Sequence, residues 1–174
     1  MLFRSPVVTD EGNALAESGA IIEYLAERYG RGRLAPAPGT PQRIRYTYWL
    51  HYAEGSAMCP LLVKLILDRI ENAPVPFFVK PIARGIARKV KSTFLNQQIQ
   101  THFDYMEAEI GRTGWFAGSE FSAADIQMSF PIEAAAARGV VDAGRPKLLE
   151  FLKRIHSRPA YQRGLERGGE YAYA

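Results

Sequence analysis

The sequence has few of the residues on which many kinds of site and anchor depend. Its 174 residues include one cysteine, Cys59, and three scattered histidines. An internal disulfide is therefore excluded, and no spacing suits a zinc site or a serine-histidine-aspartate triad. No apolar run approaches the roughly 20 residues of a membrane-spanning helix, and the first residues lack the apolar core of a signal peptide. We expect a cytoplasmic globular protein without a metal.

The net charge is small and unevenly distributed. Lysine and arginine outnumber aspartate and glutamate by 22 to 18, and the whole excess lies after residue 38. An excess of this size does not by itself indicate nucleic acid. Lys80, Arg84, Arg88 and Lys91 form a basic stripe at helical spacing, which would suit anionic lipid or nucleic acid, although a solvated face is the commoner explanation. We expect neither a nucleic-acid partner nor a membrane partner.

The first thirty residues have the pattern of a β-hairpin that runs into a helix. Residues 5–9 and 14–16 are predicted to be short strands around a turn at residues 10–13, where acidic residues, glycine and asparagine gather. Apolar residues at three-to-four spacing then predict an amphipathic helix over residues 18–30. The free N–H groups at the start of that helix would hold a small carboxylate.

The rest of the chain is predicted to be helical. Residues 31–39 are rich in proline and glycine and lack periodicity, as in a linker. The predicted helices then cover residues 42–70, 77–111, 123–138, 146–157 and 159–167. In the second half of the first long helix, the residues expected to be buried are Leu61, Leu62, Leu65, Ile66 and Ile70.

One local motif before residue 123 is specific. Ser122 and Asp125 have the spacing of a capping box, in which each side chain bonds to the backbone N–H of the other residue. The following helix is rich in alanine and other apolar residues, so we expect it to be the central buried helix, kinked at Pro131. Asp125 is therefore interpreted as a structural residue.

Two regions, in the right order, resemble cytosolic glutathione transferases. Residues 4–30, with Ser5-Pro6-Val7, an acidic turn, Glu17-Ser18-Gly19-Ala20-Ile21 and Tyr24-Leu25, resemble the second half of the thioredoxin-like domain. Residues 40–165 resemble the all-helical second domain, through the segment from Phe121 to Ile126 and the segment from Ser157 to Tyr161. The resemblance implies a mainly α fold in which a partial thioredoxin-like hairpin and helix precede an all-helical domain. The expected division is residues 1–30, a linker at 31–39, and residues 40–174.

The resemblance also implies a glutathione site. By position, Pro6 is the cis proline, the main chain of Val7 pairs with the cysteinyl part of glutathione, and Glu17 and Ser18 hold the γ-glutamyl amine and carboxylate. The residue types suit those roles, because a carboxylate binds an ammonium and a hydroxyl at a helix N-terminus binds a carboxylate. Taken alone, Ser18 would more often be only an N-cap, and Pro6 an ordinary trans proline.

The first long helix carries polar and aromatic side chains near the place where this family lines its electrophile pocket. These are Tyr46, Tyr48, Trp49, His51, Tyr52 and Glu54. Aromatic residues at helical spacing belong to a core more often than to a pocket, so both interpretations stay open.

The resemblance assigns no catalytic residue here. In this family the tyrosine, serine or cysteine that activates the glutathione thiol lies in a strand-helix-strand unit, which is expected before residue 4, where only three residues stand. The function implied is conjugation of glutathione to small hydrophobic electrophiles, a detoxification reaction, by a homodimer in its full-length form. The alternative is a non-catalytic binding or dimerisation module. As written, the chain is expected to bind glutathione weakly and not to conjugate it.

Overall fold

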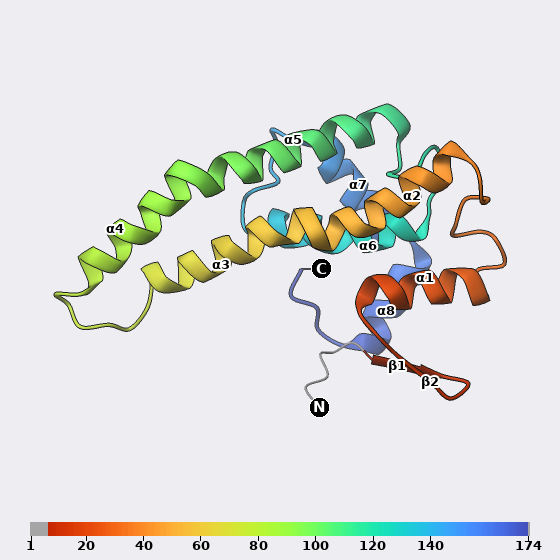
Figure 1. Ribbon diagram of the computed structural model, residues 1–174, viewed down its shortest axis with the longest axis horizontal. Coiled ribbons are helices and arrows are strands. Elements are labelled where there is room, and N and C mark those ends of the chain that lie inside the picture. The colour runs from red at the N-terminus through yellow and green to blue at the C-terminus, as the bar shows by residue number, and fades with distance from the viewer. Residues whose placement is uncertain (1–6, 174) are drawn as a thin grey trace.

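The computed structural model describes residues 7–173, so the expected cis bond at Pro6 lies outside the described residues. Two strands, β1 (Val7–Asp10) and β2 (Asn13–Ala16), precede the helices (Figure 1). The helices are α1 (Ser18–Tyr29), α2 (Pro41–Tyr52), α3 (Cys59–Glu71), α4 (Lys80–Val90), α5 (Asn96–Thr113), α6 (Ala123–Ala136), α7 (Pro146–His156) and α8 (Pro159–Gly168). The predicted mainly helical fold with one β-hairpin is confirmed.

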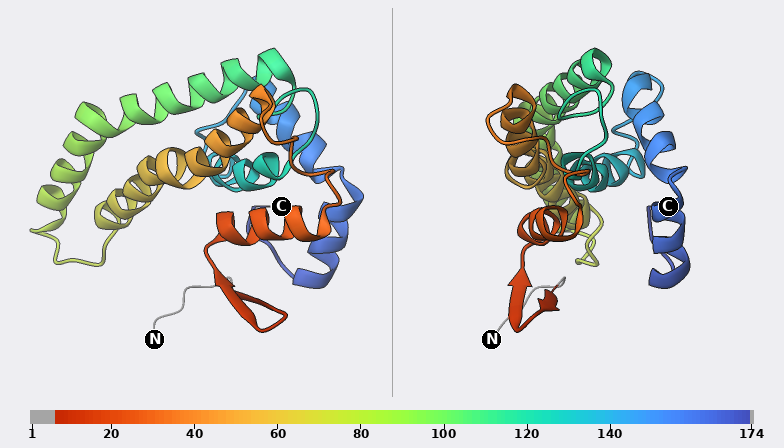
Figure 2. Two further views of the ribbon diagram at one scale, coloured as in Figure 1. Left: turned by 45° about the vertical axis from the view of Figure 1, so that its right-hand side comes forward. Right: turned by 90° about the vertical axis from the view of Figure 1, so that its right-hand side faces the viewer.

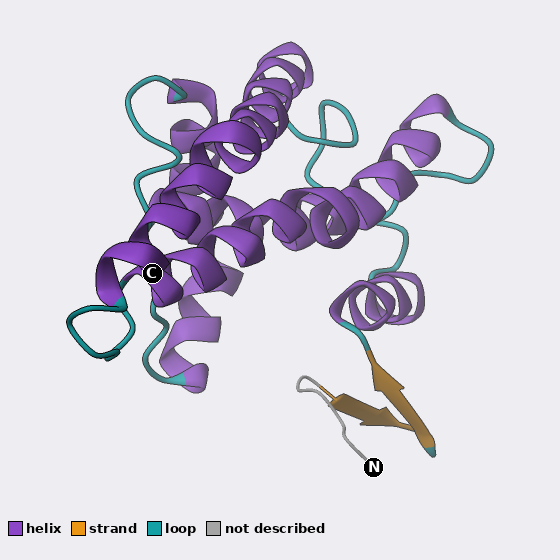
Figure 3. Ribbon diagram, turned by 60° about the vertical axis from the view of Figure 1, so that its left-hand side comes forward, coloured by secondary structure: helices purple, strands orange, loops and turns teal. Residues whose placement is uncertain are grey.

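The hairpin lies at one end of the molecule and reaches the helices through α1 (Figure 3). β1 and β2 are antiparallel, with Val7 opposite Ala16. Glu11 and Gly12 have φ values of 45° and 82°, the left-handed conformation that a tight two-residue turn requires. Tyr24 and Tyr29 of α1 both donate hydroxyl hydrogen bonds to Asp10, at 2.9 and 2.6 Å. These bonds fasten the turn of the hairpin to the helix that follows it.

Helix α6 is the centre of the core, as the sequence predicted. Eleven of its residues are buried, and it packs against α1, α2 and α7. Large aromatic side chains fill the space around it, among them Tyr46, Trp49, Phe103, Phe116 and Phe151. Pro131 lies inside the helix and is buried. Because α6 contacts elements from both ends of the chain, its side chains can meet residues of the N-terminal region.

The capping box at the start of α6 is present and extends further than the sequence indicated. Asp125 accepts hydrogen bonds from the backbone N–H and hydroxyl of Ser122, at 2.8 and 3.0 Å, and from the backbone N–H of Phe116, at 2.8 Å. Asp125 is fully buried. Burial raises the pKa of this carboxyl to about 6, although the three donated hydrogen bonds act in the opposite direction.

Two π-helical segments interrupt the long helices. Segment η1 (Ala53–Met58) joins α2 to α3, and segment η2 (Lys91–Leu95) joins α4 to α5. Segment η1 packs against α5 and α6, while η2 packs against α3. Beyond them, α3 and α4 extend together away from the other helices (Figures 1 and 2). We call α3, α4 and the turn between them the arm.

The expected burial of α3 is largely wrong. Leu61 is buried, but Leu62, Ile66 and Ile70 are 54%, 48% and 42% exposed, and Leu65 is half-buried. In the arm, α3 packs mainly against α4, so only one strip of its surface is covered.

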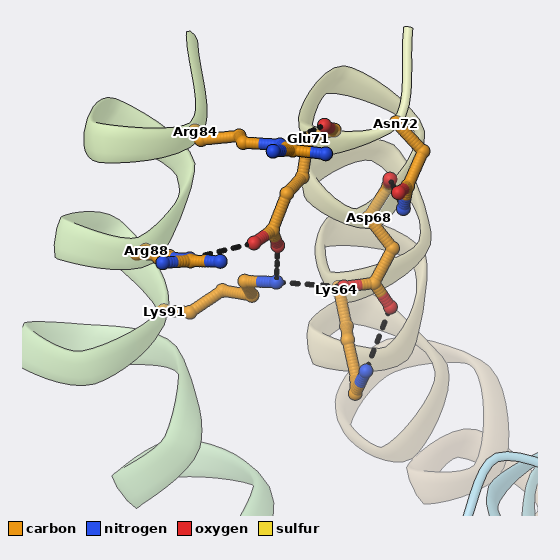
Figure 4. Close-up of polar contacts among 7 residues, drawn as sticks. All are labelled: Lys64, Asp68, Glu71, Asn72, Arg84, Arg88 and Lys91. Atoms are coloured by element: carbon orange, nitrogen blue, oxygen red, sulfur yellow. Dashed lines mark hydrogen bonds and ion pairs between the residues drawn. The ribbon is translucent and has the colours of Figure 1, made fainter. Parts of the chain in front are cut away.

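The basic stripe is not a simple solvated face either. Glu71 of α3 accepts from Arg88 at 2.8 Å and from Lys91, while Lys91 also donates to Asp68 at 2.9 Å (Figure 4). Arg84 donates to the backbone carbonyl of Glu71 at 3.4 Å. Lys91 and Arg88 hold the pKa of the Glu71 carboxyl below its usual range. The stripe therefore ties α4 to α3.

Candidate functional site

The junction between β2 and α1 is strained. Glu17 occupies the N-cap position of α1 with φ 75° and ψ 119°, and its side chain makes no capping hydrogen bond. A residue other than glycine held at positive φ costs about 1–3 kcal/mol, and such residues gather at functional sites. The Glu17 side chain is exposed. This conformation leaves an exposed carboxylate, which makes no capping hydrogen bond, beside the start of the helix.

Ser18 is the first residue of α1, and its hydroxyl is engaged with two other elements. Ser18 Oγ donates to Glu54 Oε1 at 2.7 Å and accepts from Gln127 Nε2 at 3.1 Å. Gln127 Nε2 also donates to Glu54 Oε1 at 2.8 Å. The interpretation of Ser18 as an N-cap is wrong, because Glu17 holds that position. We call Ser18, Glu54 and Gln127 the polar cluster.

The polar cluster joins three separate parts of the chain. Ser18 comes from α1, Glu54 from the π-helical segment η1, and Gln127 from α6. Gln127 is only 4% exposed and fixes the carboxylate of Glu54 beside the N-terminus of α1. Glu54 was a possible pocket residue from the sequence, whereas Gln127 was missed. The available signal was a lone amide among the alanine and apolar residues of α6.

The arrangement combines fixed donors and two carboxylates. Helix geometry leaves the first N–H groups of α1 without intrahelical acceptors, and the helix dipole favours an anion in front of them. The Ser18 hydroxyl can turn its proton from Glu54 towards a bound anion, while Gln127 continues to hold Glu54. Glu17 and Glu54 offer negative charge to a cation close by. The site is therefore suited to a small zwitterion.

The structure places the three predicted binding residues at the same end of the hairpin. Val7 pairs with Ala16, the residue directly before Glu17 and Ser18. Val7 is 44% exposed, and among the described residues β1 has a strand partner on one side only. The open side of β1 leaves backbone groups with which an extended peptide can pair.

The aromatic residues of α2 belong mainly to the core. Tyr46, Trp49 and Tyr52 are buried, while Tyr48 is exposed. The Tyr52 hydroxyl lies 2.6 Å from Nδ1 of His102. Burial raises the pKa of Tyr52, and it raises that of Tyr46 to about 12, so both hydroxyls stay protonated at neutral pH. For these three buried residues, the core interpretation is confirmed.

Two features are absent from residues 7–173. No helix there is both long enough and apolar enough to cross a membrane. Within the same residues, no group of three or more histidine, cysteine, aspartate or glutamate side chains is arranged to hold a metal ion.

Comparison with solved structures identifies the fold. Glutathione S-transferase 1-6 from Anopheles dirus species B superposes with a TM-score of 0.75 at 17% identity, over 94% of this chain and 71% of that one. A sphingomonad glutathione S-transferase complexed with glutathione gives a TM-score of 0.72 at 24% identity, over 97% and 75% of the two chains. At these identities the likeness concerns the fold alone.

Sequence comparison extends this result to the family. Glutathione S-transferase 1 of Saccharomyces cerevisiae is 29% identical over 174 residues, and glutathione S-transferase 3 of Schizosaccharomyces pombe is 31% identical over 159 residues. The alignments cover 95% and 91% of this chain, and 74% and 65% of those proteins. The family model for the glutathione S-transferase C-terminal domain matches residues 76–163, just over half of the chain. The chain therefore belongs to the glutathione S-transferase family.

Proposed function

We propose that the N-terminus of α1 binds the γ-glutamyl end of glutathione, and that the chain serves a transferase that conjugates glutathione to small hydrophobic electrophiles. The observation that carries this proposal is the Ser18 hydroxyl, which Glu54 and Gln127 hold at a helix N-terminus beside strained Glu17. The relatives also support the proposal, since they are named glutathione S-transferases and one solved neighbour is described as a complex with glutathione.

The γ-glutamyl group carries one carboxylate and one ammonium. Its carboxylate would accept from the Ser18 hydroxyl and from N–H groups of the first turn of α1. Its ammonium would lie against the carboxylates of Glu17 and Glu54. Gln127 is a positioning residue here, since it holds Glu54 without facing the ligand itself.

The cysteinyl part of glutathione would then extend along β1. Its backbone would pair with the main chain of Val7 on the open side of the strand, as a peptide adds to a sheet edge. In this proposal residues 1–30 form the glutathione-binding part, residues 31–39 the linker, and residues 40–174 the helical domain beside which the electrophile binds.

Calorimetric titration of the 174-residue chain with glutathione tests this binding site. Ser18→Ala should weaken binding by roughly tenfold or more, because a hydrogen bond to a charged group contributes about 1.5–3 kcal/mol. The matched control is Ser119→Ala, which removes an exposed hydroxyl outside the polar cluster and should leave binding unchanged. Equal affinity of Ser18→Ala and the wild-type chain would refute the role of Ser18.

Catalysis requires one further group. A hydroxyl or thiol must activate the glutathione sulfur, and the resemblance assigns that role to none of the residues in this sequence. We expect the 174-residue chain to bind glutathione without conjugating it to an aryl halide, as the alternative of a non-catalytic module also requires. Turnover above the uncatalysed rate that Ser18→Ala abolishes would show that these residues form a competent active site.

We also propose that the protein is a cytoplasmic homodimer, as the family resemblance implies. The resemblance implies that the hairpin and helix of one subunit pair with the first long helix of the other, as a two-fold dimer allows. Sedimentation at micromolar concentration should show a dimer. A monomer throughout that range would contradict this part of the proposal.

A further inference from the structure

Helix α4, the turn before it and segment η2 after it carry an apolar stripe that no other element covers. The stripe consists of Phe78, Ile82, Ile86, Val90 and Phe94, spaced four residues apart. All five are exposed, with Ile82 at 64% and Ile86 at 60%. At the tip of the arm, Phe77 is 87% exposed. Contiguous exposed apolar surface of this kind on a folded protein marks a site of interaction.

The stripe faces away from the rest of the protein. The one buried residue of α4 is Ala87, on the side of the helix that packs against α3. The arm extends away from the hairpin and from α7, so the stripe is open to a large partner (Figure 1). A broad, flat surface can therefore reach α4 without meeting other parts of the chain.

Positive charge accompanies the stripe. α4 and the first residue of η2 carry Lys80, Arg84, Arg88, Lys89 and Lys91, and no acidic residue stands between Glu71 and Asp104. The carboxylates of Asp68 and Glu71 form ion pairs with Lys64, Lys91 and Arg88 (Figure 4). Among the described residues, no ion pair involves Lys80, Arg84 or Lys89. Arg84 is bonded to the backbone carbonyl of Glu71, whereas Lys80 and Lys89 remain available to a negatively charged partner.

We propose that α4 lies on the surface of an anionic lipid bilayer, with its apolar stripe inserted at the boundary between headgroups and acyl chains. A helix with an exposed isoleucine face and lysine side chains free of ion pairs, here Lys80 and Lys89, is suited to that boundary. Nucleic acid would match the cations but would leave Ile82 and Ile86 in water. A second copy packed on this face would bring two sets of like charges together, which disfavours it.

This surface differs from what the sequence suggested. The expectation of no membrane partner rested on the lack of a spanning segment and on a basic stripe taken as solvated. A helix that lies on a membrane needs no spanning segment. The exposure of Ile82 and Ile86 distinguishes a helix that lies on a membrane from a solvated basic face. These residues are exposed because the arm extends away from the other helices.

Vesicle flotation of the full chain tests the proposal. The vesicles contain phosphatidylcholine alone or with about 30% phosphatidylserine. The wild-type chain should float with the anionic vesicles and not with the neutral ones. The double variant Ile82→Ser/Ile86→Ser should lower the partition constant by at least about tenfold, because its apolar burial is lost. Ile44→Ser is the matched control, since Ile44 is 74% exposed on α2 and should bind as the wild-type chain does.

A charge variant provides an independent measurement. Lys80→Ala/Lys89→Ala should weaken binding to anionic vesicles by about fivefold per residue removed, and salt should weaken it further. Circular dichroism melting confirms that each variant is folded. Failure of the wild-type chain to bind anionic vesicles would overturn the proposal, as would equal binding by the isoleucine variant. Loss of a dimer in the isoleucine variant, without vesicle binding by the wild-type chain, would instead assign the stripe to a second copy.

Discussion

The mutation Asp125→Ala should destabilise the protein by about 3 kcal/mol. A helix cap alone contributes about 1–2 kcal/mol, but Asp125 also accepts from the N–H of Phe116 across the preceding loop. Alanine leaves the backbone N–H groups of Phe116 and Ser122 without this acceptor, and both residues are buried. Each orphaned buried N–H costs about 1–3 kcal/mol. The effect should therefore exceed that of an ordinary cap.

Thermal and urea unfolding followed by circular dichroism measure this loss. For a chain of this length, about 3 kcal/mol corresponds to a fall in Tm of roughly 10 °C. Asp142→Ala is the matched control, because Asp142 accepts a backbone N–H from Gly144 at 2.9 Å but is exposed. Its loss should be within about 1 kcal/mol.

Two results would refute this reasoning. If Asp125→Ala and Asp142→Ala destabilised the protein equally, burial of the donors would not be the source of the effect. If the Tm of Asp125→Ala equalled that of the wild-type chain, Asp125 would have no part in stabilising the fold.

Three further outcomes are expected. The pKa of Asp125 is raised to about 6, so protonation of its carboxyl adds stability that is full below about pH 4 and is lost as the pH rises through 6. Urea titrations at several pH values should show Asp125→Asn gaining on the wild-type chain over that range. Glu133→Gln weakens the acceptor shared by His156, Tyr161 and Tyr171, so trypsin should release the C-terminal helix about tenfold faster. Lys91→Met should change the Tm by less than about 4 °C, because ion pairs near the surface contribute little.

The parts of the fold that depend on local chemistry could be predicted from the sequence. The hairpin turn, the start of α1 and the capping box of Ser122 and Asp125 all involve residues within a few positions of one another. The burial of α6 followed from its composition, since a helix that is apolar on all sides has to be covered.

Long-range features could not be predicted in this way. Ser18, Glu54 and Gln127 lie in three different elements, and nothing in their local sequence indicates that they meet. Periodicity showed that α3 has an apolar face, but which apolar residues are covered depends on the neighbours present. Ile66 is exposed because the arm leaves the bundle, which is a property of the whole fold.

The π-helical segment η1 places Glu54 in the polar cluster without changing the register of the helices on either side. A π-helical turn holds one more residue than an α-helical turn, so it accommodates an inserted residue locally. Deleting Gly55 would return the segment to α geometry and leave α3 in register with α2, so Leu61 would keep facing the core. Glu54 lies within the segment and would move relative to Ser18. A deletion of one codon would thus alter the proposed ligand site while the direction of the arm stayed the same.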